Sequence, residues 1–240
     1  MPKVIAFPAA ADGEAAPRSL TTLAFDRPRS DILAGELRPK DKLRIQQLTE
    51  RYDIGATAIR EALSRLVTEG LVTSEDQRGF CVAGVSRDEL LDLTRTRLWI
   101  EQTALRAAIA NGDVEWEAGV MASLHRLSRM AAPGTSAQAA IAWRQAHRQF
   151  HFALLEGCRS AWTMRLCATL YDQTERYRNL SGKVRDGAKR DVLKEHRAIA
   201  DAVLARDADR ACELLAEHFE GTTKIILGPD GIASMGVKPA

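Results

Sequence analysis

Residues 43–82 read LRIQQLTERYDIGATAIREALSRLVTEGLVTSEDQRGFCV and hold the most specific local pattern in the chain. Apolar residues recur at helical spacing in two parts of this segment, from Leu43 to Tyr52 and again from Ala56 onward. Asp53-Ile54-Gly55 interrupts the spacing between them, which predicts a tight turn. The buried face of the second helix is expected to consist of Ile59, Ala62, Leu63, Leu66 and Val67. The segment therefore begins as two helices joined by a short turn.

A two-stranded hairpin is expected to follow the second helix. Gly70 stands where a glycine commonly ends a helix, and Leu71-Val72-Thr73 has the residues of a strand. Residues 75–79 predict a turn, and Phe80-Cys81-Val82 predicts the returning strand. Helix, turn, helix and hairpin make the plan of a winged helix-turn-helix, whose second helix enters the DNA major groove. The same spacing also fits a small helical domain with an ordinary solvated surface.

The charge of this segment supports DNA binding moderately. The whole chain has a formal net charge of +2, which neither requires nor excludes a nucleic acid partner. Residues 38–65 contain seven basic and four acidic side chains, which gives this segment a local charge of +3. The candidate DNA contacts are Arg44, Thr57, Arg60, Arg65, Arg78 and Gly79. Arg78 and Gly79 belong to the hairpin turn, which could enter the adjacent minor groove.

The rest of the chain divides around the predicted winged helix-turn-helix. Residues 1–17 are expected to be a flexible tail, and residues 18–85 to form the DNA-binding domain. Residues 86–227 follow a helical pattern almost throughout, and residues 228–240 are expected to be a second flexible tail. Breaks are expected at Pro133-Gly134 and Ser181-Gly182. We therefore expect a mostly α-helical protein, with an N-terminal winged helix-turn-helix and a C-terminal all-α antiparallel helix bundle.

Composition excludes several classes of protein. The chain has 240 residues, of which 45% are hydrophobic and 28% charged, as in ordinary globular proteins. It has no run of 18 apolar residues and no signal peptide pattern, so we expect neither a membrane span nor secretion. Its four cysteines are scattered without a CxxC pair, which favours reduced thiols. A cytoplasmic location is the prediction.

Three or four of the five histidines are predicted to meet inside the helical domain, namely His147 or His151, or both, with His196 and His218. His147 and His151 are four residues apart in a helical pattern, so both rings leave the same face. His196 and His218 each lie 11 residues from Asp207, where we expect the turn between two antiparallel helices. Both therefore stand about 16 Å from that turn. His151 comes before the helix that we expect at about residues 160–181. With the same rise per residue, His151 stands at the height of His196 and His218 to within about one turn.

Facing neutral imidazoles suit a divalent transition metal, with zinc or nickel as the expected ion. The alternative is a pair of solvent-facing histidines beside two buried ones that are hydrogen-bonded. Three protein ligands would leave a coordination position open for water or a carboxylate. Arg97, Arg176 and Arg178 are candidate clamps for that carboxylate, because a guanidinium binds one in bidentate fashion. The alternative for each is a surface role, and Arg97 could simply pair with Glu101 one turn later.

Several motifs support a resemblance over roughly residues 18–227. They are DILAGELRP at 31–39, LTERY at 48–52, IREALSRL at 59–66, EGLV at 69–72 and QRGF at 77–80. With the helical C-terminal half, they resemble the GntR family of bacterial transcription regulators, in the FadR-type branch with an FCD ligand-binding domain. Three further segments are similar to a glutarate-sensing subgroup of that branch. These are GATAIREAL at 55–63, HRQFHFALLEGCRSAW at 147–162 and QTERYRNL at 173–180.

The resemblance implies a dimeric winged-helix repressor that a small carboxylate releases from DNA. FCD domains typically bind metal through an Asp-x3-His pair and two later histidines, which His151, His196 and His218 match. His147 takes the place of the aspartate, either as the fourth ligand or as a hydrogen-bond partner of the effector. Gly55-Ala56 stands where most of the family has Ser-Arg, so one arginine contact to DNA is missing.

Three functions remain as hypotheses. The leading one is a metabolite-responsive regulator, acting as a homodimer on a near-palindromic operator because one winged helix covers one half-site. The second is an all-α metal-dependent enzyme with a helix-turn-helix appendage, although the chain has neither HExxH nor a nucleophile motif and no enzyme activity is expected. The third is a DNA-binding protein whose histidine pocket holds no metal.

Overall fold

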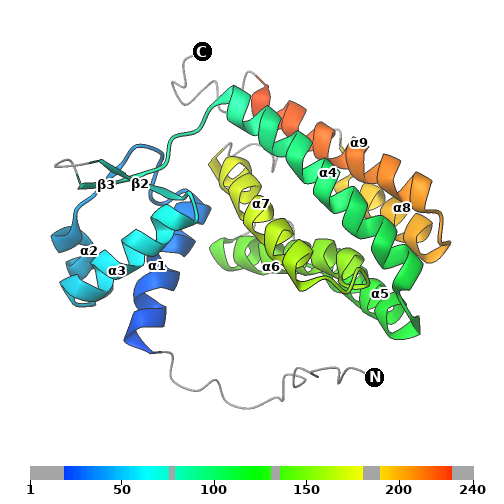
Figure 1. The fold of residues 1–240 in the computed structure, drawn as a ribbon, viewed down its shortest axis with the longest axis horizontal. Coiled ribbons are helices and arrows are strands. Elements are labelled where there is room, and N and C mark those ends of the chain that lie inside the picture. The colour runs from blue at the N-terminus through cyan, green and yellow to red at the C-terminus, as the bar shows by residue number, and fades with distance from the viewer. Residues whose placement is uncertain (1–18, 76–78, 131–135, 181–189, 229–240) are drawn as a thin grey trace.

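The computed structural model describes residues 19–75, 79–130, 136–180 and 190–228. It is mostly helical, with a small sheet near the N-terminus and long helices in the rest of the chain (Figure 1), which confirms the predicted fold class. The two predicted tails (apart from Gly228) and the predicted breaks at Pro133-Gly134 and Ser181-Gly182 lie outside the described residues. Among the described helices, none combines the length and hydropathy that a membrane span requires.

The N-terminal domain packs helices around a core of its own. Its helices are α1 (Leu20–Ala34), α2 (Ile45–Tyr52) and α3 (Ala56–Thr68). The side chain of Ser19 caps α1 by accepting a hydrogen bond from the backbone of Thr22. Gly70 follows α3 with a φ of +71°, a conformation that glycine adopts without strain. The predicted apolar face of α3 is buried, except that Val67 is half-buried.

The wing contains one strand more than the sequence predicts. Strands β2 (Val72–Glu75) and β3 (Gly79–Val82) form the expected antiparallel hairpin, with Thr73 opposite Cys81. A third strand, β1 (Lys42–Leu43), pairs with the other edge of β3, so the order is β1-β3-β2. Two residues are too short to show the alternation that marks a strand in a sequence. This pairing brings the start of α2 beside the wing.

Long helices build the C-terminal domain. They are α4 (Arg87–Asn111), α5 (Val114–Ser128), α6 (Ala137–Glu156), α7 (Ala161–Leu180), α8 (Val192–Leu204) and α9 (Ala208–Leu227). A side chain caps the first turn of each of the six: Ser86, Asp113, Ser136, Ser160, Asp191 and Asp207. Asp207 is the cap that the sequence predicts, so the turn on which the histidine positions depend is confirmed.

The helices pack as antiparallel neighbours around a buried apolar core. α4 lies along α9 and also contacts α7, α5 pairs with α6, and α8 pairs with α9 (Figure 1). The core includes Leu105, Phe150, Ile199 and Leu215, which have almost no exposed surface. Burying such side chains is the main source of stability in a bundle of this kind. The histidine site therefore lies within a packed framework.

Helix α7 connects the two domains through its polar side chains. Gln173 Nε2 donates to the carbonyl oxygen of Glu69, the residue that ends α3, over 2.7 Å. Asn179 Nδ2 donates to the carbonyl oxygen of Leu33 near the end of α1, over 2.6 Å. Asp172 accepts hydrogen bonds from Arg29 of α1 and from a second arginine on α6. Helices α1 and α3 are thus held directly by one helix of the C-terminal domain.

Candidate functional site

The four predicted histidines converge in the C-terminal domain. His147 and His151 come from α6, His196 from α8 and His218 from α9, and all four are buried. One ligand nitrogen from each lies within 4.8 Å of the others. His147 Nε2 and His151 Nε2 are 3.2 Å apart. That is close to the spacing of about 3.3 Å between two nitrogens on one tetrahedral zinc, given Zn–N bonds of about 2.0–2.1 Å.

Burial keeps these imidazoles neutral. Loss of hydration lowers the pKa of His147, His151 and His196 well below the usual value. The nearby Arg178 guanidinium lowers each pKa further, because it repels a second positive charge. The pKa of His218 is also lowered by burial, although the hydrogen bond that His218 Nδ1 donates to Glu195 opposes that change. Neutral rings at physiological pH have the free lone pairs that a metal requires.

Two imidazoles are oriented by neighbouring side chains. His147 Nδ1 lies 2.8 Å from the hydroxyl of Tyr171, and His218 Nδ1 lies 2.8 Å from Glu195 Oε2. Arg190 contacts the same carboxylate of Glu195 over 2.5 Å. Burial acts to raise the pKa of Glu195, but the hydrogen bonds that it accepts from His218 and Arg190 lower this pKa to about 2. A carboxylate behind a histidine is the arrangement that commonly fixes a metal ligand.

Other nitrogens of the cluster have no partner. Among the buried polar side-chain atoms of the described residues, His151 Nδ1 and His196 Nε2 make no hydrogen bond. A buried polar atom without a partner costs roughly 1–3 kcal/mol. An ion bonded to His196 Nε2 removes that cost for this ring, so the donor set fits a divalent transition metal.

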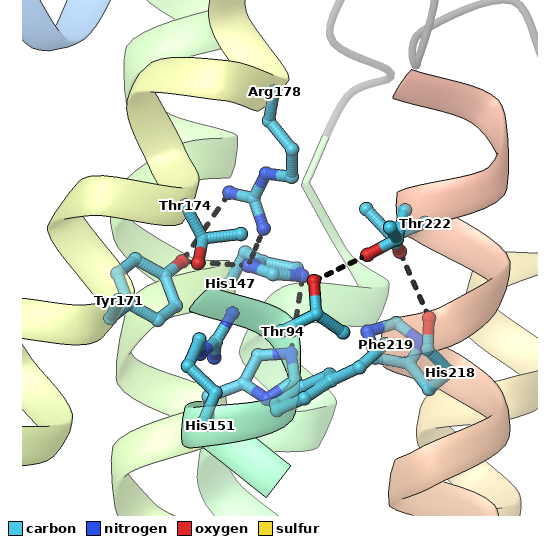
Figure 2. Close-up of a pocket in the computed structure, with 11 residues that line it drawn as sticks. Thr94, His147, His151, Tyr171, Thr174, Arg178, His218, Phe219 and Thr222 are labelled. Atoms are coloured by element: carbon cyan, nitrogen blue, oxygen red, sulfur yellow. Dashed lines mark hydrogen bonds between the residues drawn. The ribbon is translucent and has the colours of Figure 1, made fainter. Parts of the chain in front are cut away.

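Two cavities adjoin the cluster. The smaller has a volume of about 20 Å³ and includes His147, His151 and His218 in its lining. Figure 2 shows Arg178 reaching toward His147 and Tyr171, with Thr94 and Thr222 on the opposite side. The larger has a volume of about 380 Å³ and is lined by His147, His196 and His218 together with apolar side chains. A ligand can therefore approach the histidines from two sides.

Two of the three predicted carboxylate clamps are at this site. Arg97 and Arg178 line the smaller cavity, and Arg178 also lines the larger one. Arg97 makes the expected pair with Glu101 over 2.8 Å and stacks on Phe219, so its charge is already partly compensated. Arg178 Nη2 pairs with Glu175 over 2.5 Å, and its Nη1 lies 3.3 Å from His147 Nδ1.

Arg176 is placed elsewhere, which corrects its prediction as a clamp. Its guanidinium is buried and donates to the carbonyl oxygen of Ala83 over 3.3 Å, with Glu89 3.4 Å away. Ala83 lies in the connection between the two domains, and Glu89 lies in the first turn of α4. Successive helical residues diverge by about 100° around the axis, so Arg176 and Arg178 point to different sides of α7. We therefore assign Arg176 to domain packing.

Two side chains at the site were not singled out from the sequence. Tyr171 contacts His147, and Glu195 contacts His218, yet each lies in a pattern that an ordinary helix would show. Glu195 directly precedes His196 in the chain, which is the only local signal that it stands near the cluster. Tyr171 has no comparable signal, because its partner lies 24 residues away on another helix.

A second group of predicted residues lies on the surface of the N-terminal domain. Thr57 and Arg60 are exposed on α3. Arg44, Arg60 and Gly79 line one open groove between α2, α3 and the wing, and Lys42 joins them there. Gly79 has a φ of +79°, which a residue with a side chain adopts only with strain. This groove has the position and charge of a DNA-binding face.

The other three predicted DNA contacts, Thr57, Arg65 and Arg78, are not among the residues that line this groove. Arg65 packs its guanidinium 4.0 Å from the centre of the Phe25 ring on α1. It is exposed, but it is directed toward the rest of its own domain, because position 65 lies about 140° around the axis of α3 from Arg60. Arg78 lies outside the described residues.

Comparison with known families divides the chain in the same way. Residues 22–82 match the model of the bacterial regulatory proteins of the gntR family. Residues 92–221 match the model of the FCD domain. The two matches coincide with the domain that bears the basic groove and the domain that bears the histidines.

Curated relatives cover most of the chain. The HTH-type transcriptional regulator BphR of Paraburkholderia xenovorans is 43% identical over 211 residues, which is 87% of this chain and 86% of the relative. The HTH-type transcriptional repressor GlaR of Escherichia coli is 39% identical over 200 residues, covering 80% and 88% of the two chains. The solved structure of E. coli McbR/YncC has a TM-score of 0.72 at 21% identity and covers 87% of this chain and 97% of that one. The last similarity concerns the fold alone.

Proposed function

The chain belongs to the GntR family of bacterial regulatory proteins and carries an FCD domain, and we propose that it is a repressor that a small carboxylate releases from its operator. Its relatives are transcription regulators and not enzymes. The observation that supports a ligand-controlled regulator is the buried cluster of neutral histidines beside cavities that contain Arg97 and Arg178. Similarity to a glutarate-sensing subgroup makes glutarate the first effector to test.

The proposal assigns a divalent metal, zinc or nickel, to the histidines. His151, His196 and His218 would be its ligands, and His147 would be either the fourth ligand or a partner of the effector. The support is that the donor nitrogens are neutral and in part without partners. When bound, the ion supplies positive charge that attracts a carboxylate. Glu195 holds the ring of His218, and Tyr171 holds the ring of His147.

Helix α7 offers a direct route from the ligand to the DNA. Tyr171 faces the small cavity, while Asp172 and Gln173 bind Arg29 and Glu69 of the DNA-binding domain. A displacement of α7 on ligand binding would therefore act on the end of α3. Such coupling is reciprocal, so operator DNA should weaken effector binding by the factor by which effector weakens DNA binding.

We further propose that the regulator is a homodimer on a near-palindromic operator. Large apolar side chains stand exposed on α4 and α7, which pack side by side. Trp99 is 71% exposed, Trp162 is 74% exposed and Leu166 is 51% exposed. Exposed aromatic residues of this size are typical of protein interfaces. A second copy burying them by two-fold symmetry would present two recognition helices to two half-sites.

Gel-shift titration of the operator with and without glutarate tests the proposed function. The expected result is sequence-selective binding that salt weakens and glutarate abolishes. Treatment with a chelator should remove the glutarate response and leave DNA binding. A normal glutarate response from protein shown by elemental analysis to be metal-free would mean that the histidines only form the walls of the pocket. Catalytic turnover of a carboxylate without DNA would contradict the regulator and favour an enzyme.

A further inference from the structure

The larger cavity contains a cation whose charge is not compensated. Three arginines line it, namely Arg144, Arg178 and Arg190. Arg178 is paired with Glu175 and Arg190 with Glu195, each over 2.5 Å. Arg144, half-buried on α6, has neither an ion pair nor a hydrogen bond to any other described residue. Of the described residues that line this cavity, none is acidic, so an anion near Arg144 would come from a ligand.

The remaining wall of the cavity suits a carbon chain. Leu127, Trp143, Leu193 and Ile225 are among its apolar lining residues. Its volume of about 380 Å³ falls in the range of about 300–1,000 Å³ that is typical of small-molecule sites. The smaller cavity, at about 20 Å³, has room for about one water molecule. The body of an organic acid therefore belongs in the larger cavity, with only a polar end near the smaller one.

The positions of Arg144 and the histidines define two ends for such a ligand. Arg144 and His147 are three residues apart on α6, so they lie on neighbouring positions of one face, about 4.5 Å apart along the axis. Trp143 stacks on His147 with ring centres 4.7 Å apart. His196, whose Nε2 has no partner, lines the same cavity. An acid bound at the histidines would thus run past Trp143 toward Arg144.

We propose that Arg144 binds the second carboxylate of a dicarboxylate whose short apolar chain lies against Trp143. This inference rests on the proposed function, because it takes the first carboxylate to bind at the histidines. It makes Arg144 the residue that distinguishes a dicarboxylate from a monocarboxylate of equal chain length. The distinction arises because a guanidinium forms charge-assisted hydrogen bonds with the far carboxylate and only loses hydration beside a methyl group.

Calorimetric titration of the purified full-length protein with glutarate and with pentanoate tests the assignment. Wild-type protein should bind glutarate more tightly by on the order of tenfold to a hundredfold, as expected for hydrogen bonds to a charged group. Arg144→Gln should remove this preference by weakening glutarate and leaving pentanoate unchanged. Arg197→Gln is the matched control, because Arg197 is an exposed arginine on α8 and the same charge is lost. The unfolding temperature without ligand shows whether each variant is folded.

The possible results separate the two proposals. Equal binding of glutarate and pentanoate to wild-type protein, or a glutarate preference that survives in Arg144→Gln, would overturn the role of Arg144 and leave a carboxylate-controlled repressor intact. An equal loss of both acids in the variant would also overturn it, since it would show a general effect on the cavity. Failure of wild-type protein to bind either acid would overturn the proposed function and this inference together.

Discussion

The two domains present their functional residues in opposite ways. The basic groove of the N-terminal domain consists of exposed side chains from one short segment, with Arg44, Arg60 and Gly79 along its walls. The histidines of the C-terminal domain are buried and come from three helices that are distant in sequence. A surface that binds a large, charged partner must remain hydrated, whereas a site for a metal and a small acid gains strength from exclusion of water.

This difference has a consequence for mutations. A change at the groove should weaken DNA binding without altering the buried site. A change at the histidines should weaken binding of metal and effector without altering the groove. Substitutions at the contacts of α7 with Arg29, Glu69 and Leu33 should instead affect communication between the domains. Substitutions in each region can therefore show whether the domains are as independent as their construction indicates.

His196→Ala is expected to have the largest effect. It removes one proposed ligand, so metal affinity should fall by more than the 10- to 100-fold that loss of an outer-sphere partner typically costs. Release by glutarate should disappear while operator binding stays largely intact, because the groove lies in the other domain. Elemental analysis paired with gel shifts measures both. His125→Ala is the control, since His125 is exposed on α5, and an equal metal loss in that variant would refute the assignment.

Arg60→Ala tests the basic groove of the N-terminal domain. Arg60 is exposed on α3 and lines the groove, so its loss should weaken operator binding by about 1–3 kcal/mol. Metal content and glutarate affinity should not change. Gel-shift titration at fixed salt gives the first quantity and calorimetry the second. Unchanged operator affinity would place Arg60 outside the interface, and Arg197→Ala controls for the loss of one positive charge.

Asp172→Asn should weaken the coupling between the two sites while leaving effector binding and operator binding themselves intact. The variant keeps the shape of the side chain but loses the charge that binds Arg29 and Arg148. The factor by which glutarate weakens operator binding should shrink by the equivalent of about 0.5–2 kcal/mol. Asp209→Asn is the matched control, because Asp209 pairs with Arg106 on the surface of the C-terminal domain. A full response in Asp172→Asn would mean that coupling follows another route.

Replacing one glycine by serine in each domain should change the free energy of unfolding in opposite directions. The change in the N-terminal domain should be the smallest of these effects. Gly55 is the N-cap of α3, and a Cβ there meets no atom within 4 Å, so Gly55→Ser should stabilise the protein by a few tenths of a kcal/mol. Gly112 differs because a Cβ would lie 2.1 Å from the ring of Trp116, so Gly112→Ser should destabilise by about 1–3 kcal/mol. Denaturant unfolding measures the free energy of unfolding of both variants. Equal changes in the two variants would contradict this prediction.

Local pattern alone predicted most of the helices and the wing hairpin. The apolar faces of α2 and α3, the glycine after α3 and the cap at Asp207 each depend on residues within one or two turns. Even the meeting of the histidines followed from helix rise and the position of a turn, because straight antiparallel helices convert sequence distance into height. The strand β1 was missed because two residues carry no detectable period.

The direction of each side chain around the buried site depended on the tertiary structure. The sequence predicted both Arg176 and Arg178 as carboxylate-binding residues. In the structure Arg176 contacts the connection between the domains, whereas Arg178 faces the histidines. Tyr171, Glu195 and the uncompensated Arg144 became visible only once the helices were packed together. Sequence periodicity specifies that a face is buried, but the neighbour it contacts depends on the packing angle and register of helices far apart in the chain.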